Sequence, residues 1–176
     1  LRRDSFLNLN GRWEFAVQTD EALPKRYERE ILVPFCPESL LSGQKIHPAE
    51  GSFLFYRRGF VLPEGFNRGR VLLQIGAADQ QLDCYLNGKW IGGHLGGYER
   101  MTFELTDALE EHNELVLRVR DDLRDKTQPY GKQTMRRGGM WYTPVSGIWQ
   151  TVWLESVPRE YVHALRIRAD DCRAEI

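Results

Sequence analysis

The sequence is poor in cysteine and has no excess charge of either sign. Its three cysteines, Cys36, Cys84 and Cys172, are odd in number and far apart. This spacing argues against a disulfide framework and matches no metal-binding motif, so we expect no metal site and no cofactor. The 24 basic and 25 acidic residues leave a formal charge of −1. Without a basic surface, a nucleic acid is a poor choice of partner.

Long apolar runs are also missing. No stretch approaches the roughly 20 consecutive apolar residues that span a bilayer, so a membrane is not an expected partner. No charged-then-apolar segment of a secretory signal opens the chain. Because the first residue is Leu1 and not methionine, the chain can be a mature form or an excised fragment. The compartment therefore stays open between the cytoplasm and the periplasm or exterior of a bacterium.

A convincing amphipathic helix is the third absence. About ten short strand-like segments with turn signals between them make up most of the chain, a pattern typical of a β-sandwich or jelly roll. Cys84 alternates with Leu82 and Leu86, which places it in the core. The length of 176 residues is enough for one such domain with a good core. We therefore expect an all-β, jelly-roll β-sandwich.

The clearest local signal is a β-hairpin. Residues 81–86 alternate in polarity and meet Asn87-Gly88, two residues that tolerate positive φ, before residues 89–92 return. The segment that follows, 92–98, contains four glycines. We expect it to be irregular.

The chain is organised around residues 141–155, which contain three of its five tryptophans. The alternation after Gly147 predicts one strand over 148–155, inside its sheet and not at an edge. Trp149 and Trp153 share one face of that strand. We expect the pair to face the sandwich core or a domain interface, with a sugar-binding platform as the alternative.

Residues 121–146 are predicted to form one long loop, a feature that is uncommon in compact domains and often functional. Its first acidic residues, Asp121, Asp122 and Asp125, lack the periodicity of a calcium-binding loop, and we expect them to be surface acids.

Beyond Pro158, residues 161–168 predict one further strand that finds no partner in the sequence. We therefore divide the chain into a jelly-roll domain over 1–157 and the first strand of a truncated second domain over 158–176. This ending favours a piece of a longer protein over a complete module.

Five segments resemble, in order, the amino-terminal sugar-binding domain of glycoside hydrolase family 2, which includes β-galactosidases, β-glucuronidases and β-mannosidases. The segments are 9–15 (LNGRWEF), 56–60 (YRRGF), 85–92 (YLNGKWIG), 94–98 (HLGGY) and 146–155 (SGIWQTVWLE). The last segment is the most specific. The sequence of residues 141–150 most resembles β-galactosidase-like members. The resemblance implies a galactose-binding-domain-like jelly roll, followed from residue 158 by the start of an immunoglobulin-like domain.

The resemblance also implies a function. A full-length parent would be a retaining glycosidase of β-galactoside type, whose two carboxylates lie about 5–5.5 Å apart on a downstream (β/α)₈ barrel. The present chain would hold no catalytic residue and would support the barrel and shape its substrate mouth. Its partners would be carbohydrate, through the parent, and its own immunoglobulin-like and barrel domains. A homo-oligomer of the parent is left open.

One apparent catalytic motif is rejected. Asn113-Glu114 has the residue order of the family's acid/base, but it leads into the strand-like segment 115–119 and not into a barrel. Because a motif requires its structural context, we do not assign Glu114 a catalytic role.

The candidate sugar contacts are Trp141, Tyr142, His94, Arg136 and Arg137. Trp141 and Tyr142 could stack on the apolar C–H face of a sugar ring and offer a polar edge. His94 could hydrogen-bond a hydroxyl, and Arg136-Arg137 could grip a carboxylated sugar through bidentate bonds. The alternatives are structural: an aromatic that packs under its loop or against the next domain, a histidine that braces a loop, and a solvated charge pair.

One feature of the family is not carried over. Some of its β-galactosidases have an acidic residue just before the tryptophan that corresponds to Trp141, whereas residues 138–140 here are Gly-Gly-Met. Two alternatives to a barrel-supporting domain remain, a free-standing carbohydrate-binding module and a purely structural interaction domain. Titration of the chain with galactosides and other glycosides separates them.

Overall fold

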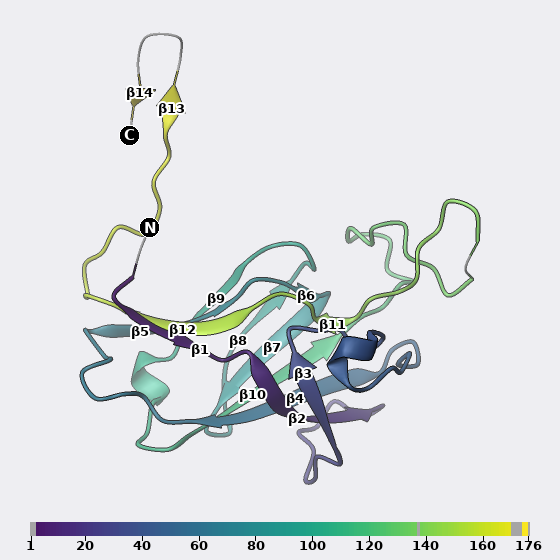
Figure 1. Cartoon of the computed structure of the whole chain (residues 1–176), viewed down its shortest axis with the longest axis horizontal. Helices are drawn as coiled ribbons and strands as arrows, with labels where there is room; N and C mark the ends of the chain where they lie inside the picture. The colour runs from purple at the N-terminus through teal and green to yellow at the C-terminus, as the bar shows by residue number, and fades with distance from the viewer. Residues whose placement is uncertain (1–2, 137, 170–173, 176) are drawn as a thin grey trace.

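The computed structural model describes residues 3–136, 138–169 and 174–175 and shows a β-sandwich without α-helices in that part of the chain (Figure 1). Two antiparallel sheets form its body, one of four strands in the order β1-β12-β5-β9 and one of six in the order β3-β2-β4-β10-β7-β8. The all-β sandwich expected from the sequence is confirmed.

The four-stranded sheet contains β1 (Ser5–Asn8), β12 (Val152–Val157), β5 (Arg70–Ile75) and β9 (Met101–Glu104). The six-stranded sheet contains β3 (Arg29–Val33), β2 (Gly11–Gln18), β4 (Phe53–Phe60), β10 (Asn113–Arg120), β7 (Gln81–Leu86) and β8 (Lys89–Leu95). Two short pairs are β6 (Ala78–Asp79) with β11 (Gly147–Ile148) and β13 (Arg168–Ala169) with β14 (Ala174–Glu175). The 3₁₀ turns are η1 (Leu40–Ser42) and η2 (Thr106–Ala108).

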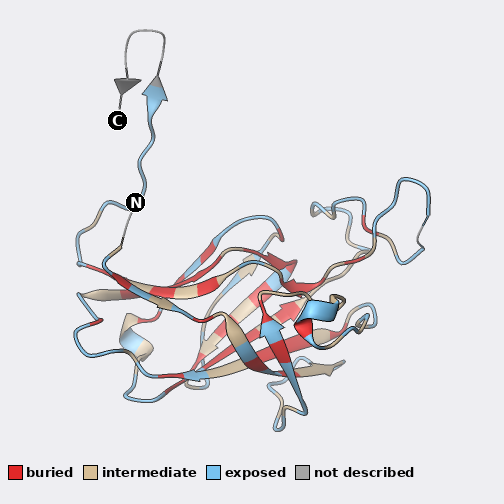
Figure 2. Cartoon of the chain, in the orientation of Figure 1, coloured by how far each residue is buried: buried red, intermediate tan, exposed pale blue. Residues whose placement is uncertain are grey.

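The core fills the space between the two sheets, where every second residue of most strands is buried (Figure 2). Trp13 and Tyr56 are among its largest fully buried side chains. The indole N–H of Trp13 donates to the Leu9 carbonyl at 2.8 Å, which satisfies its polar atom. Cys84 is fully buried, as expected, and both Cys36 and Cys84 are free thiols. Cys172 lies outside the described residues.

The predicted hairpin is present, but its second strand is longer than expected. β8 continues through the glycine-rich segment to Leu95. A Cβ atom at Gly92 would lie 3.3 Å from the Phe103 ring, and one at Gly93 would lie 2.9 Å from the Asp83 carboxylate. These two glycines therefore serve close packing within a strand and not a turn.

The single strand expected over 148–155 is two strands. β11 pairs with β6 on one side of a break at residues 149–151, and β12 then enters the four-stranded sheet. β12 lies between β1 and β5 and is therefore interior, as predicted.

Trp149 and Trp153 consequently form no shared platform. Trp149 lies in the break, where its indole N–H donates to the Gly97 carbonyl at 3.0 Å and its ring packs edge-on against Tyr98 at 6.1 Å. Trp153 lies on β12, with its ring 6.4 Å from that of Phe6. The break in the strand gives each tryptophan its own partner.

The strand expected over 161–168 is wrong for most of its length. Residues 161–167 form no strand, and β13 begins only at Arg168. The β13–β14 pair stands away from the sandwich in Figure 1. The division after residue 157 remains a proposal. In the part of the chain that the structure describes, no helix is long and apolar enough to cross a membrane.

Candidate functional site

The loop predicted over residues 121–146 is present and extends from one end of the sandwich (green in Figure 1). Two isolated bridges are the regular pairings found in its described residues. One joins Gln133 to Tyr142 and the other joins Gly138 to Trp141. The loop thus folds back on itself and presents residues 138–142 at a turn.

Gln133 anchors the middle of this loop. Its side chain is buried, and its Nε2 donates to Asp79 Oδ2 at 3.0 Å. Its Oε1 accepts the Val145 backbone N–H at 2.5 Å. Asp79 is itself buried at the end of β6. One amide side chain therefore ties two points of the loop to the sandwich.

Glu38 holds the last residue of the loop from the irregular segment after β3. The Ser146 hydroxyl donates to Glu38 Oε1 at 2.7 Å, and the Ser146 backbone N–H donates to Oε2 at 3.2 Å. Together, the Gln133 and Ser146 contacts hold the middle and the end of the loop against the sandwich. We call the contacts of Asp79, Gln133, Glu38 and Ser146 the loop clamp.

The loop exposes four large apolar side chains. Trp141 is 44% exposed and Tyr142 is 63% exposed, and Met135 and Met140 are also exposed. We call these four residues the aromatic tip. Both aromatic side chains are therefore partly accessible to solvent, and more than half of the Trp141 surface is covered.

The remaining candidate residues fall in different places. Arg136 lies exposed on the same loop as the aromatic tip. His94 is on β8, where its Nε2 atom is buried and has no hydrogen-bond partner among the described residues. Arg137 lies outside the described residues. Glu114 lies exposed on β10 and pairs with Arg57 at 3.4 Å.

Sequence reasoning missed an acidic group beside the clamp. Asp121 was expected at the surface, but its Oδ1 atom is buried and has no hydrogen-bond partner in the described structure. Burial and the nearby carboxylates of Asp79 and Glu38 raise the pKa of Asp121 to about 7. Burial also raises the pKa of Asp79, against the lowering effect of the Gln133 hydrogen bond. Nothing in the local sequence distinguishes Asp121 from its neighbour Asp122, because the difference arises from tertiary packing.

The acidic group was also compared with the geometry of a metal site. Across residues 3–136, 138–169 and 174–175, no three His, Cys, Asp or Glu side chains are placed to hold a metal ion. The carboxyls instead repel one another at the base of the loop, which costs stability when they are ionised.

Replacement of Asp121 by Asn is expected to stabilise the protein, with a gain that grows with pH. The Asp121 pKa is about 3.8 in the unfolded chain and about 7 in the folded chain, so the folded state binds more protons between these values. Stability therefore falls as the pH rises from about 4 to about 7. With partial solvent screening, Asp121→Asn should add about 1–2 kcal/mol at pH 8 and less at pH 5.

Urea unfolding at the two pH values measures this effect. Asp122→Asn is the matched control, because Arg124 lowers the pKa of Asp122 to about 2 and the loss of its charge should destabilise at pH 8. Equal stability of Asp121→Asn and the parent chain at pH 8 would contradict the assignment.

Comparison with known proteins identifies the type of domain. No family model matches the chain. A Formosa agariphila protein that has been assigned as a β-glucuronidase is 31% identical over 86 residues, which are 48% of this chain and 10% of that protein. An uncultured Clostridium sp. β-glucuronidase has a TM-score of 0.72 at 24% identity, over 97% of this chain and 33% of that one. The Bacteroides uniformis β-glucuronidase has a TM-score of 0.63 at 26% identity, over 89% and 18%.

These relatives correct one expectation and confirm another. Two of these proteins are β-glucuronidases and the third has been assigned as one. The expectation of a β-galactosidase-like member, which was drawn from residues 141–150, is therefore not supported. The chain spans a third or less of the length of these three proteins. The resemblance to the amino-terminal domain of glycoside hydrolase family 2 that was drawn from the sequence is supported, because the chain is similar in sequence and in β-sandwich fold to parts of these glycosidases.

Proposed function

We propose that this chain is the non-catalytic amino-terminal domain of a longer glycosidase that cleaves β-glucuronides. The observation that carries the proposal is the clamped loop, which holds two exposed aromatic side chains, Trp141 and Tyr142, clear of the core. The substrate class comes from the β-glucuronidase relatives. In this proposal the loop forms part of the wall of the substrate site in the parent.

The clamp reduces the conformational entropy that the aromatic tip would lose on binding a substrate. A loop of this length loses much conformational entropy when it orders around a substrate. Because Gln133 and Ser146 are hydrogen-bonded to the sandwich, part of this conformational entropy is already lost during folding and not during binding. Trp141 and Tyr142 can then stack on a sugar face with little further ordering.

The same loop carries a group suited to an acidic sugar. Arg136 is exposed beside the aromatic tip in the sequence. A guanidinium can bind a carboxylate through two parallel hydrogen bonds, which a neutral galactoside lacks. Arg136 is therefore the residue to which we assign recognition of the glucuronide carboxylate.

Catalysis itself is assigned to the rest of the parent. A retaining glycosidase needs two carboxylates about 5–5.5 Å apart across the scissile bond. Of the acids at the loop base, Asp79 is buried and Glu38 is bonded to Ser146, and we assign none of them a catalytic role. The chain thus supplies binding and shape, and the two catalytic carboxylates lie elsewhere.

Steady-state kinetics of the full-length protein test this function. We expect kcat/KM for p-nitrophenyl β-D-glucuronide to exceed that for the β-D-galactoside by about 100-fold or more, which corresponds to about 2.7 kcal/mol. The 176-residue chain alone should hydrolyse neither. Equal or inverted preference would overturn the substrate class, and turnover by the isolated chain would overturn the non-catalytic role.

A further inference from the structure

The outer face of the six-stranded sheet carries a second aromatic surface, on strands far from the loop in sequence. Trp90 lies on β8, two residues after the turn at Asn87-Gly88, and is 57% exposed. Its register partner on β7 is Tyr85, whose side chain points to the same outer face. A single exposed aromatic side chain is common on protein surfaces, so the case for a binding surface rests on what surrounds Trp90.

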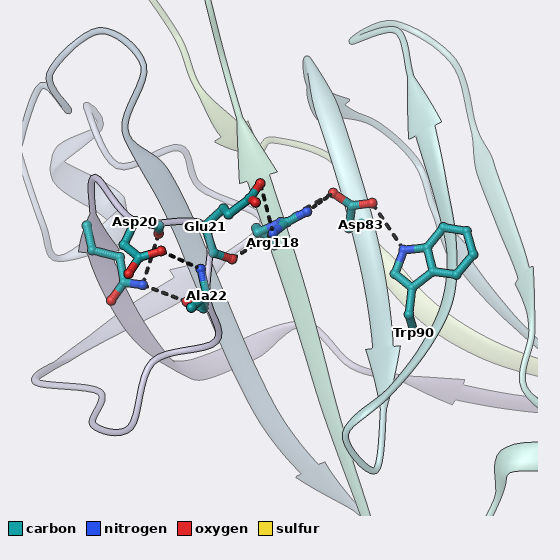
Figure 3. A network of polar contacts seen from close by, with 7 residues as sticks. Asp20, Glu21, Ala22, Asp83, Trp90 and Arg118 are labelled. Atoms are coloured by element: carbon teal, nitrogen blue, oxygen red, sulfur yellow. Dashed lines mark hydrogen bonds and ion pairs between the residues drawn. The ribbon is translucent and has the colours of Figure 1, made fainter.

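Trp90 is held in a fixed orientation. Its indole N–H donates to Asp83 Oδ1 at 3.2 Å, and Asp83 Oδ2 accepts from Arg118 at 2.9 Å. Arg118 in turn donates to the Glu21 carbonyl at 2.6 Å. Figure 3 shows this line of contacts across the sheet, from the loop after β2 through Arg118 and Asp83 to Trp90. Both the Arg118 and Asp83 side chains are largely buried, so the network is rigid.

A hollow of about 320 Å³ opens beside the same aspartate. Its lining includes Gln81, Asp83, Gly93 and Leu95. Gly93 is the register partner of Asp83 and leaves the floor open, since a Cβ atom there would lie 2.9 Å from the carboxylate. The hollow is open to solvent, so it is a shallow groove on the sheet face and not an enclosed pocket. The oriented Trp90 ring and a hollow of mixed polar and apolar lining thus share the Asp83 carboxylate.

The charges of this network indicate whether a neutral or an acidic sugar suits the surface. Arg118, Asp83 and Glu21 sum to one negative charge, and the guanidinium of Arg118 is already bonded to the other two residues. The guanidinium of Arg118 is therefore not available to bind a carboxylated sugar. A neutral sugar suits it, because its C–H face can stack on Trp90 and its hydroxyls can bond to Asp83 and Gln81.

We propose that Trp90, Asp83 and the hollow beside Gly93 form a binding surface for a neutral glycan chain. The surface extends along β7 from Tyr85, beside Trp90, to Gln81 in the hollow. The four residue steps between them span about 13 Å, which is longer than one sugar ring, so we assign the surface a chain and not only a terminal sugar. It differs in ligand from the aromatic tip, to which we assign an acidic sugar, and it does not depend on the reaction of the parent.

Isothermal titration calorimetry of the 176-residue chain tests the proposal. The probes are cellohexaose, mannohexaose and xylohexaose as neutral chains and hexagalacturonate as the acidic one. We expect saturable binding of at least one neutral probe, with a Kd below about 1 mM, and weaker binding of the acidic probe. Trp90→Ala should weaken the neutral complex at least about tenfold, and Trp90→Phe should weaken it less.

Phe6→Ala is the matched control. Phe6 is also 57% exposed but lies on β1 in the other sheet, so its loss should leave glycan binding unchanged. The proposal is overturned by the absence of saturable binding of every neutral probe, by equal effects of the two alanine variants, or by tighter binding of hexagalacturonate. A Trp90-dependent dimer in sedimentation velocity, without glycan binding, would identify a protein interface instead.

Discussion

Replacement of Gly147 by alanine is expected to lower the free energy of unfolding by about 3–4 kcal/mol. Gly147 has a φ of +74°, where an L side chain is strained. A Cβ atom there would overlap the hydroxyl of Tyr56 and lie 3.2 Å from Leu54 Cδ1. Tyr56 is fully buried and cannot move aside without opening the core. The loss should appear as a fall in Tm of about 10 °C.

Two further variants separate the clash from the backbone strain. Gly43→Ala is the control, because Gly43 has a similar φ of +81° but no atom within 4 Å of an added Cβ, and it should cost only about 1 kcal/mol. Gly147→Ala combined with Tyr56→Phe should recover part of the loss, since the hydroxyl is removed. Equal losses of stability in Gly147→Ala and Gly43→Ala would contradict the predicted clash between a Cβ atom at position 147 and Tyr56.

Elements whose residues alternate simply could be predicted from the sequence. The hairpin over residues 81–92 and the strand that begins at Asn113 were confirmed because turn residues and alternating polarity agree there. Residues 92–95 were missed because glycine is a turn signal in sequence, whereas here Gly92 and Gly93 make room for Phe103 and Asp83. That need exists only once the sheets have packed.

The break between β11 and β12 could not be read from alternation. The polarity pattern continues through residues 149–151, but Trp149 is bonded to Gly97 and turned out of line. The two strands pair in different sheets, a choice made by partners distant in sequence. Local patterns specify strands better than they specify where one strand ends and the next begins.

The sugar contacts of the candidate site stay a prediction. Trp141 and Tyr142 were chosen because they stand in a long loop, where exposed aromatics are a functional signal, and both are partly exposed in the structure. The clamp was missed because Gln133 and Asp79 are 54 positions apart and neither belongs to a motif. Asp121 was misjudged for the same reason: its raised pKa is a product of burial beside Asp79 and Glu38.

The second large effect concerns the aromatic tip in the full-length protein. Replacement of both Trp141 and Tyr142 by alanine should raise KM for p-nitrophenyl β-D-glucuronide by about 100-fold, with kcat within about threefold. Each exposed ring is assigned about 1.4 kcal/mol of stacking energy, a factor of ten. Because the proposed contacts of the rings lie away from the reacting bond, they should stabilise the bound substrate and the transition state equally.

This double variant also tests the central claim, that a clamped loop on this domain shapes the substrate site of a glycosidase. Phe6→Ala, at a comparably exposed aromatic on β1, provides the control and should leave KM unchanged. The decisive measurement is KM for the β-glucuronide in the full-length protein with and without the two aromatic rings. The account predicts a rise of about 100-fold at nearly constant kcat, and an unchanged KM would contradict it.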